Sequence, residues 1–173
     1  TKDDAATYFQ EMLWMQLCTF IPYEGNIKID SNIESAVNLM LKELGSIDVV
    51  IPNAGLGHFN PLSEGTMNEW RSMVDVNVTG ILKTIHATLP HLISSNGHLV
   101  NIGSVAARQV FANSGVYCAT KHFVLAMSES IRIELSDQIA ITTINPGAVN
   151  TEFIEHTANE SLKNEYKPRF NSG

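Results

Sequence analysis

Hydrophobic residues in this chain recur in two patterns that alternate along the sequence. In one pattern they return every three or four positions, which predicts amphipathic helices over residues 1–17, 31–44, 66–91 and 114–135. In the other they form short continuous runs, which predict buried strands at 47–51, 99–102 and 139–144, with a further short strand at 25–30. Helices and strands in alternation indicate an α/β fold built on a parallel sheet with right-handed crossovers.

Local signals define the ends of two of these helices. Ser31 and Glu34 have the spacing of a capping box, in which a hydroxyl and a carboxylate each satisfy a free backbone N–H. Thr66 and Glu69 repeat this spacing at the start of the longer helix. Gly45 is placed to end the helix at 31–44.

The composition narrows the class of protein. With 173 residues, 44% hydrophobic and 17% charged, the chain is long enough for one domain with a sizeable core. A net charge of −7 without a basic run argues against nucleic-acid and anionic-membrane partners. No apolar stretch approaches the roughly 20 residues that span a bilayer, and no signal-peptide pattern opens the sequence. Cys18 and Cys118 make no disulfide framework, so we expect a cytoplasmic protein with reduced thiols, and the scattered histidines predict no metal site.

Three residues in the second half carry the most specific chemistry: Ser104, Tyr117 and Lys121. Tyr117 and Lys121 are four apart near the start of a predicted helix, so their side chains lie on one face. A free tyrosine has a pKa near 10, and lowering it by roughly 3 units takes about 4 kcal/mol of preferential phenolate stabilisation. A fixed ammonium can supply this, and a serine hydroxyl can hold a carbonyl or alcohol oxygen. Alone, Tyr-x-x-x-Lys also fits a packed aromatic beside a solvated lysine.

Further polar and small residues lie where a ligand would bind. Asn53-Ala54-Gly55 follows the strand at 47–51, and Pro146-Gly147 follows the strand at 139–144. Ligands of open parallel sheets bind beyond the carboxyl ends of the strands, and small residues let them approach the backbone. Asn77 falls within the hydrophobic stripe of its helix, where it either braces neighbouring backbone or handles water and ligand.

Together these motifs resemble those of the classical short-chain dehydrogenases/reductases, from about residue 30 to residue 153. The matching positions, in the family's order, are Asn53-Ala54-Gly55, Asn77, Ser104 thirteen residues before Tyr117, Lys121, and Pro146-Gly147 with Thr151. The resemblance implies a Rossmann-like, doubly wound parallel sheet. It also implies hydride transfer between NAD or NADP and a small-molecule carbonyl or secondary alcohol.

The resemblance also implies a role for each matching residue. Tyr117 would be the general acid/base, Lys121 would lower its pKa and hold the nicotinamide ribose, and Ser104 would polarise the substrate carbonyl. Asn77 would position a water that relays protons. Besides Tyr117 and Lys121, the cofactor would be lined by Asp30 beside the adenine, by Asn53, Ala54 and Gly55 on the adenosine-ribose side, by Pro146 and Gly147, and by Thr151 at the nicotinamide carboxamide. The family's usual dimer implies a homo-oligomer through helices 66–91 and 114–135.

The chain departs from the family pattern in two places. It has no counterpart of the glycine-rich T-G-x-x-x-G-x-G loop, which cradles the pyrophosphate after the first strand, and none of the final strand. We therefore expect an incomplete sheet, a single partial domain over residues 1–173, an unpaired edge on the strand at 47–51, and a mobile lid or tail over residues 154–173. We also expect weak cofactor binding or none, because the main anion site for the dinucleotide is missing.

Three interpretations stay open. In the first, this sequence is a fragment or truncated product of an oxidoreductase. In the second, it is a catalytically silent relative that persists as a dimerising interaction protein. In the third, residues 1–25 substitute for the missing strands. The retention of Ser104, Tyr117 and Lys121 favours the first interpretation. NAD and NADP fit equally, as do lipid-like, sugar-like and small keto substrates.

Overall fold

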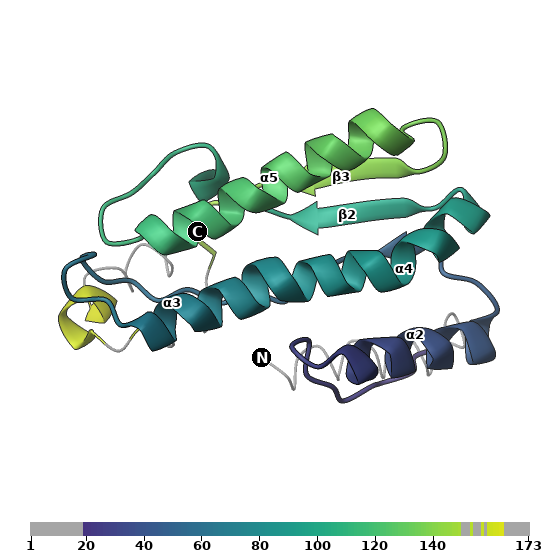
Figure 1. Ribbon diagram of the computed structural model, residues 1–173, viewed down its shortest axis with the longest axis horizontal. Helices are drawn as coiled ribbons and strands as arrows, with labels where there is room; N and C mark the ends of the chain where they lie inside the picture. Colours follow the sequence, from purple (N-terminus) through teal and green to yellow (C-terminus); the bar gives the residue numbers. More distant parts are fainter. Residues whose placement is uncertain (1–18, 150–152, 154–156, 158, 165–173) are drawn as a thin grey trace.

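The computed structural model describes residues 19–149, 153, 157 and 159–164 (Figure 1). Helices and strands alternate in it as the sequence predicts. In chain order they are α2 (Asp30–Leu44), β1 (Val49–Val50), α3 (Met67–Val74), the π-helix η1 (Asp75–Gly80), α4 (Ile81–Ser95), β2 (His98–Ile102), the 3-10 helix η2 (Val105–Ala107), α5 (Gly115–Leu135) and β3 (Ala140–Ile144). The helix expected at residues 1–17 and most of the tail expected at residues 154–173 lie outside the described residues.

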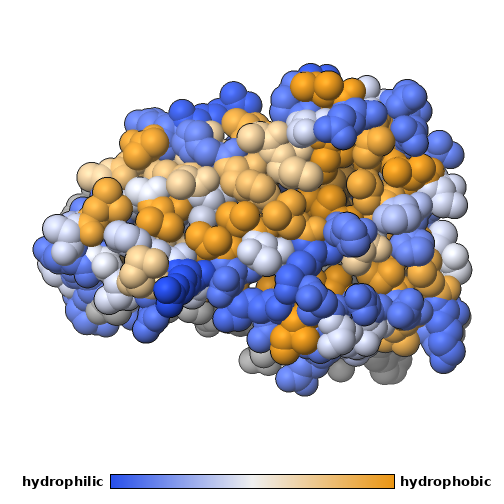
Figure 2. Space-filling view, in the orientation of Figure 1, coloured by the Kyte–Doolittle hydropathy of each residue, from blue (hydrophilic) through white to orange (hydrophobic). Residues whose placement is uncertain are grey.

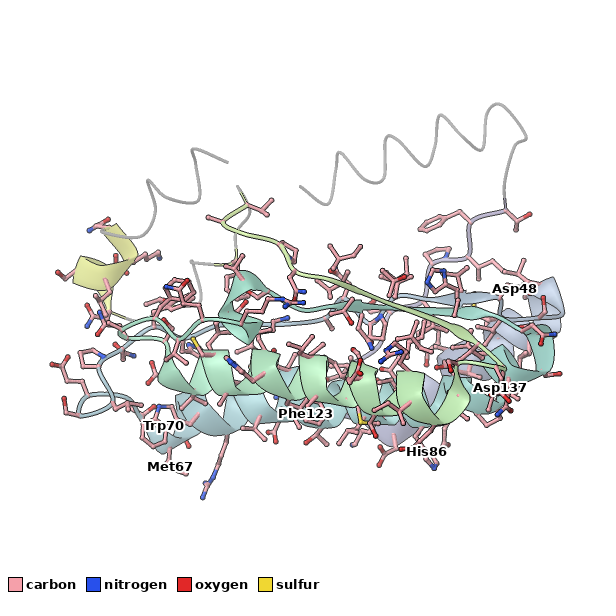
Figure 3. All side chains as sticks on the ribbon, turned by 90° about the horizontal axis from the view of Figure 1, so that it is seen from above. Asp48, Met67, Trp70, His86, Phe123 and Asp137 are labelled. Atoms are coloured by element: carbon pink, nitrogen blue, oxygen red, sulfur yellow. The ribbon has the colours of Figure 1, made fainter. Side chains whose placement is uncertain are left out.

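The three strands form a parallel sheet in the order β1-β2-β3. In the central strand, Leu99 is paired with Val50 on one side and Ile141 on the other. This row of side chains faces helices α2, α4 and α5, which lie on one side of the sheet (Figures 1 and 3). The buried core between them consists of Val37, Ile47, Val50, Ile81, Ile85, Leu92, Leu99, Val124, Ile131 and Ile139. The fold is therefore α/β and Rossmann-like, as predicted.

Apolar side chains are exposed on the opposite face of the sheet. Successive strand residues point to opposite faces, and Val49 is 54% exposed, Ile51 57% and Ile144 48%. Parallel sheets are normally covered on both faces, whereas α2, α4 and α5 all contribute to the core on the first face. Among the described strands, β1 pairs with β2 alone. Within the part of the chain that the structure describes, the unpaired edge predicted for the strand at 47–51 is thus confirmed.

A continuous helical rod formed by α3, η1 and α4 runs from Met67 to Ser95, slightly longer than the predicted helix. It begins with the expected capping box: Thr66 Oγ1 accepts the Glu69 N–H at 3.3 Å, and the Glu69 carboxylate accepts the Thr66 N–H at 2.8 Å. Around Asn77 the rod widens into the π-helix η1, which the hydrophobic period did not predict. Single π-turns inside α-helices are frequent at functional sites.

The segment before α2 differs from the prediction. No strand forms at residues 25–30; instead, α2 begins at Asp30 with Ile29 as its N-cap. No side chain caps this helix, so the capping box expected of Ser31 and Glu34 is wrong. The preceding turn is held by Asn32, whose Oδ1 accepts the N–H of residue 26 at 2.8 Å. A strand needs a neighbouring strand to complete its hydrogen bonds, and none of the described strands pairs with this segment.

Two expectations from composition bear on the fold. Cys118 is a free thiol, 1% exposed, on the buried side of α5, while Cys18 lies outside the described residues. None of the helices in the described part of the chain combines the length and the apolar character needed to cross a membrane.

Candidate active site

The candidate site lies beyond the carboxyl ends of the three strands. In Figure 3, Met67 and Trp70 mark this end of the molecule, because the loop after β1 leads directly to α3. Asp48 and Asp137, which precede β1 and β3, lie at the opposite end. Loops after parallel strands are the usual ligand-binding elements of α/β folds.

Ser104 is held at the end of β2 by hydrogen bonds that continue the β2–β3 ladder. Gly103 N–H donates to the carbonyl oxygen of Ile144 at 2.7 Å. Ser104 N–H then donates to Asn145 Oδ1 at 3.2 Å. The Ser104 Oγ accepts the Ala106 N–H at 3.1 Å, and the residue is buried. Because a hydroxyl has one proton and two lone pairs, the Ser104 proton remains available for a neighbouring oxygen.

Tyr117 lies in the first turn of α5, with its hydroxyl next to Ser104. Burial removes water from the phenol and raises the pKa of Tyr117 above its ordinary value of 10.0. The hydrogen bond with Ser104 opposes this and lowers the pKa, but burial outweighs it. The net direction is opposite to the lowered pKa that the sequence predicted. The physical reason is that the aromatic surroundings exclude water, while Lys121 Nζ stands 6.0 Å from the ring centre.

Lys121 lies one helical turn beyond Tyr117, as the spacing predicts, and is buried. Its Nζ donates a hydrogen bond to the carbonyl oxygen of Ile102 at 2.9 Å, which ties α5 to the end of β2. Burial lowers the pKa of Lys121 from 10.5 to about 8, because the charged ammonium loses hydration. An ammonium has three donors, and the bond to Ile102 uses one of them.

Asn77 is fully buried in η1 and braces three segments. Its Oδ1 accepts the Leu56 N–H at 2.9 Å, and its Nδ2 donates to the Leu56 carbonyl oxygen at 2.8 Å. The same Nδ2 donates to Thr120 Oγ1 at 3.0 Å, and Thr120 in turn donates to the Tyr117 carbonyl at 2.7 Å. Of the two interpretations offered by the sequence, bracing is the one these contacts describe. Water positioning stays a prediction.

The small-residue loop after β1 meets the lysine directly. A Cβ added to Gly55 would lie 3.5 Å from Asn77 Oδ1 and 3.7 Å from Lys121 Nζ. Residues 53–55 are all exposed, so they present backbone to whatever occupies the space beside Lys121. On the other side of the site, the carbonyl oxygen of half-buried Pro146 accepts the N–H of residue 105 at 2.9 Å, and Gly147 is exposed.

One predicted site residue, Asp30, is not part of this cluster. Asp30 is exposed at the start of α2, where it forms an ion pair with Lys83 of α4 at 2.8 Å. Lys83 also donates to the carbonyl oxygen of Lys28 at 2.8 Å, so the acidic side chain is bound to a helix rather than placed at a strand end. Thr151 lies outside the described residues.

The structure adds residues that the sequence reasoning missed. Asn145 accepts from Ser104, and Thr120 links Asn77 to α5. The rings of Phe59 and Phe153 both lie against Tyr117. One signal was available for Phe153, which stands two residues after Thr151 in the matched motif. No comparable signal marks Phe59, because Tyr117, the residue it contacts, is distant in the sequence and becomes its neighbour only in the folded chain.

Comparison with known proteins agrees with the fold. The short chain dehydrogenase family matches over residues 2–162, and the chain belongs to this family. An uncharacterized oxidoreductase of Staphylococcus saprophyticus is 39% identical over 140 residues, which make up 79% of this chain and 55% of the relative. The chain thus spans about half the length of the curated relatives it matches.

Two solved structures illustrate the likeness. An alcohol dehydrogenase from the archaeon Thermococcus sibiricus, complexed with 5-hydroxy-NADP, superposes with a TM-score of 0.80 at 27% identity, covering 88% of this chain and 65% of that one. Serine dehydrogenase from Escherichia coli has a TM-score of 0.68 at 32% identity, covering 72% and 59%. Both comparisons extend over most of the present chain and less than two thirds of the longer partner.

Proposed function

We propose that this chain carries the proton-handling half of an oxidoreductase that transfers hydride between NAD or NADP and a small-molecule carbonyl or secondary alcohol. One observation supports this above all. Ser104, Tyr117 and Lys121, from two separate elements, converge at the carboxyl ends of the strands. The exposed loop at Gly55 opens directly beside the lysine.

Tyr117 is the general acid/base of this proposal. Burial raises its pKa, so at neutral pH the phenol is protonated and ready to donate to a carbonyl oxygen during reduction. Ser104 shares that oxygen through its hydroxyl proton, since its Oγ already accepts from Ala106. Protonated Lys121 favours the phenolate that forms after proton transfer, because an opposite charge nearby stabilises it.

The residues present fit the nicotinamide-ribose end of a dinucleotide. Lys121 offers ammonium donors, and Gly55 lacks the Cβ that would fill the space beside them. We assign cofactor contacts to Asn53, Ala54, Gly55, Pro146, Gly147 and Thr151, with Asn77 as the brace of the loop. When bound, the cofactor supplies or accepts the hydride. No glycine-rich phosphate loop occurs among the described residues, and we propose weak cofactor affinity for this chain by itself.

We further propose that copies of the chain associate through the helices at 66–91 and 114–135. Large apolar side chains are exposed on both: Met67 (54%), Val74 (41%), Leu82 (38%) and Ile133 (70%). Figure 2 shows hydrophobic residues gathered over the face that α4 and α5 present. An exposed apolar face of this kind is typical of a protein–protein contact.

The test is carbonyl reduction by this chain at millimolar NADH and NADPH, with binding followed by nicotinamide fluorescence. We expect slow turnover that Tyr117→Phe abolishes. Tyr23→Phe, which removes the hydroxyl of a tyrosine 42% exposed before α2, should leave turnover unchanged. Equal turnover in wild type and Tyr117→Phe would contradict the role given to Tyr117. A folded chain that neither binds cofactor nor turns over would instead support an interaction protein.

A further inference from the structure

Three aromatic rings from separate segments, those of Phe59, Tyr117 and Phe153, lie against one another. Phe59, in the loop after β1, has its ring centre 5.7 Å from that of Tyr117, and Phe153 has its centre 5.4 Å away. The two phenylalanine rings are 6.1 Å apart in an edge-to-face arrangement, so the three centres close a triangle. We infer that this aromatic triad makes the site selective for carbonyl or alcohol substrates with aryl or alkyl substituents. The inference rests on the proposed function.

The polar residues on either side of Phe59 are directed away from Tyr117. His58 Nε2 is hydrogen-bonded to Ser72 Oγ at 3.1 Å, and Asn60 Nδ2 donates to the Glu69 carboxylate at 3.0 Å. Both partners belong to α3. Between the histidine and the asparagine, Phe59 has its ring against that of Tyr117. The loop thus places the Phe59 ring at the site, while the His58 imidazole and the Asn60 amide form hydrogen bonds with α3.

Apolar side chains are also exposed in the loops that carry Phe59 and Ser104. Leu62 is 63% exposed and borders Gly115, the first residue of α5. Val105, which follows Ser104, is 43% exposed, and Val110 in the same loop is 67% exposed. Exposed apolar groups in such loops are typical of a surface that binds an apolar ligand. Arg108 is the charged residue of the loop at 105–114.

The site would select among substrates because their substituents differ in what they lose when they leave water. A substrate oxygen held by Tyr117 and Ser104 places its substituents close to the half-buried Phe153 ring, with the buried Phe59 ring packed against it. An aryl or alkyl group there exchanges water for ring contact, whereas a hydroxyl or ammonium loses water without gaining a partner. Unpaired polar groups lower kcat/KM by far more than a missing methylene does. Sugars, polyols and amino acids are therefore disfavoured.

Propiophenone and dihydroxyacetone serve as the two probes, with the chain at millimolar NADH or NADPH. We expect kcat/KM for propiophenone to exceed that for dihydroxyacetone about 100-fold, and Phe153→Ser to reduce this ratio about 10-fold. Phe59 is 5% exposed, so its replacement must keep most of the side-chain volume. Phe59→Leu does so and is the second variant in which the ratio is measured. Leu44→Ser, 46% exposed at the end of α2, is the control and should leave the ratio unchanged.

Each outcome separates the inference from the proposed function. Turnover with equal kcat/KM for both ketones, or with dihydroxyacetone preferred, overturns the inference and leaves the proposed function standing. If neither ketone is reduced, the proposed function fails, and saturation-transfer NMR of propiophenone decides the inference. Binding that Phe153→Ser weakens about 10-fold while Leu44→Ser retains it supports the aromatic triad. No binding, or equal binding by both variants, overturns it.

Discussion

Asn77 and Leu56 exchange two hydrogen bonds, one in each direction, at 2.9 and 2.8 Å. The side-chain amide thus pairs with a loop as a neighbouring strand would, although it comes from a helix. Its remaining donor reaches Thr120, one residue before Lys121. A single buried residue therefore fixes the loop at Gly55 relative to the helix that carries the tyrosine and the lysine.

Asn77→Leu should destabilise the fold by about 2 kcal/mol or more, because it removes the partner of the Leu56 N–H and carbonyl oxygen and one of the two partners of the buried Thr120 hydroxyl. Asn68→Leu is the matched control, since Asn68 is exposed on α3 and should change stability by no more than about 0.5 kcal/mol. Urea denaturation measures both. Equal losses in the two variants would contradict the bracing role.

Gly103→Ala should displace Asn145 and with it the backbone of Ser104. A Cβ at Gly103 would overlap Asn145 Oδ1 and lie 3.3 Å from the Ile144 carbonyl oxygen. We expect a loss of stability of about 1–3 kcal/mol from this overpacking, with turnover reduced alongside. The double variant Gly103→Ala/Asn145→Ala makes room for the methyl group and should recover part of the stability.

Gly147→Ala is the control for this prediction. A Cβ at Gly147 would meet nothing within 4 Å, so its effect on thermal unfolding should be small. If the double variant is no more stable than Gly103→Ala alone, contact with Asn145 is not the cause.

The buried Lys121 makes stability depend on pH in a defined direction. Its pKa is about 8 in the folded chain and 10.5 when unperturbed. Between these values the unfolded chain binds more protons, so the free energy of unfolding rises with pH across this window. The penalty is present in full below about pH 8 and amounts to about 3 kcal/mol.

Lys121→Met removes this ionisation, so it should gain stability relative to wild type near neutral pH and lose that advantage as pH rises through the window. Urea denaturation at about pH 7 and about pH 9.5 gives the difference between the two proteins at each pH. Lys42→Met, at a side chain 79% exposed, is the control and should show no such change. A difference that stays constant with pH would argue against a lowered lysine pKa.

Thr66→Ala and Ser31→Ala compare two caps that look alike in the sequence. The Thr66 side chain accepts the Glu69 N–H, and its loss should cost about 1 kcal/mol. Ser31 caps nothing in the structure, so Ser31→Ala should be close to neutral. Thermal unfolding of the two variants decides between them. An equal cost for Ser31→Ala would mean that the predicted box forms after all.

The contrast between these caps shows what could be predicted from sequence. Helices α2, α4 and α5 follow from local hydrophobic period, and the three strands follow from apolar runs that a parallel sheet requires. The expected strand at 25–30 was wrong because a strand depends on a partner, and none of the described strands supplies one. Asp30, which was placed at that strand's end, consequently pairs with Lys83.

The candidate site likewise contains one relationship that could be predicted from the sequence and one that could not. Tyr117 and Lys121 are linked by helical spacing, so their proximity could be predicted. Phe59 and Phe153 are 94 residues apart (153 − 59) and meet only in the folded chain. Their rings help to exclude water from the phenol, and that burial reverses the expected direction of the Tyr117 pKa. Desolvation depends on all the neighbours at once, which spacing along the chain does not give.

The open edge of β1 leads to the last prediction. Val49 is 54% exposed there, while Val50, its neighbour in the strand, is 9% exposed and packs into the core. A lysine at an exposed edge position opposes edge-to-edge pairing of strands. Val49→Lys should therefore reduce concentration-dependent association, measured by light scattering, with the unfolding transition retained. Val50→Lys should instead lower the free energy of unfolding by about 2 kcal/mol or more, because it buries a charge. If Val49→Lys leaves association unchanged and Leu82→Lys on α4 reduces it, the copies meet through the helical face and not through the sheet edge.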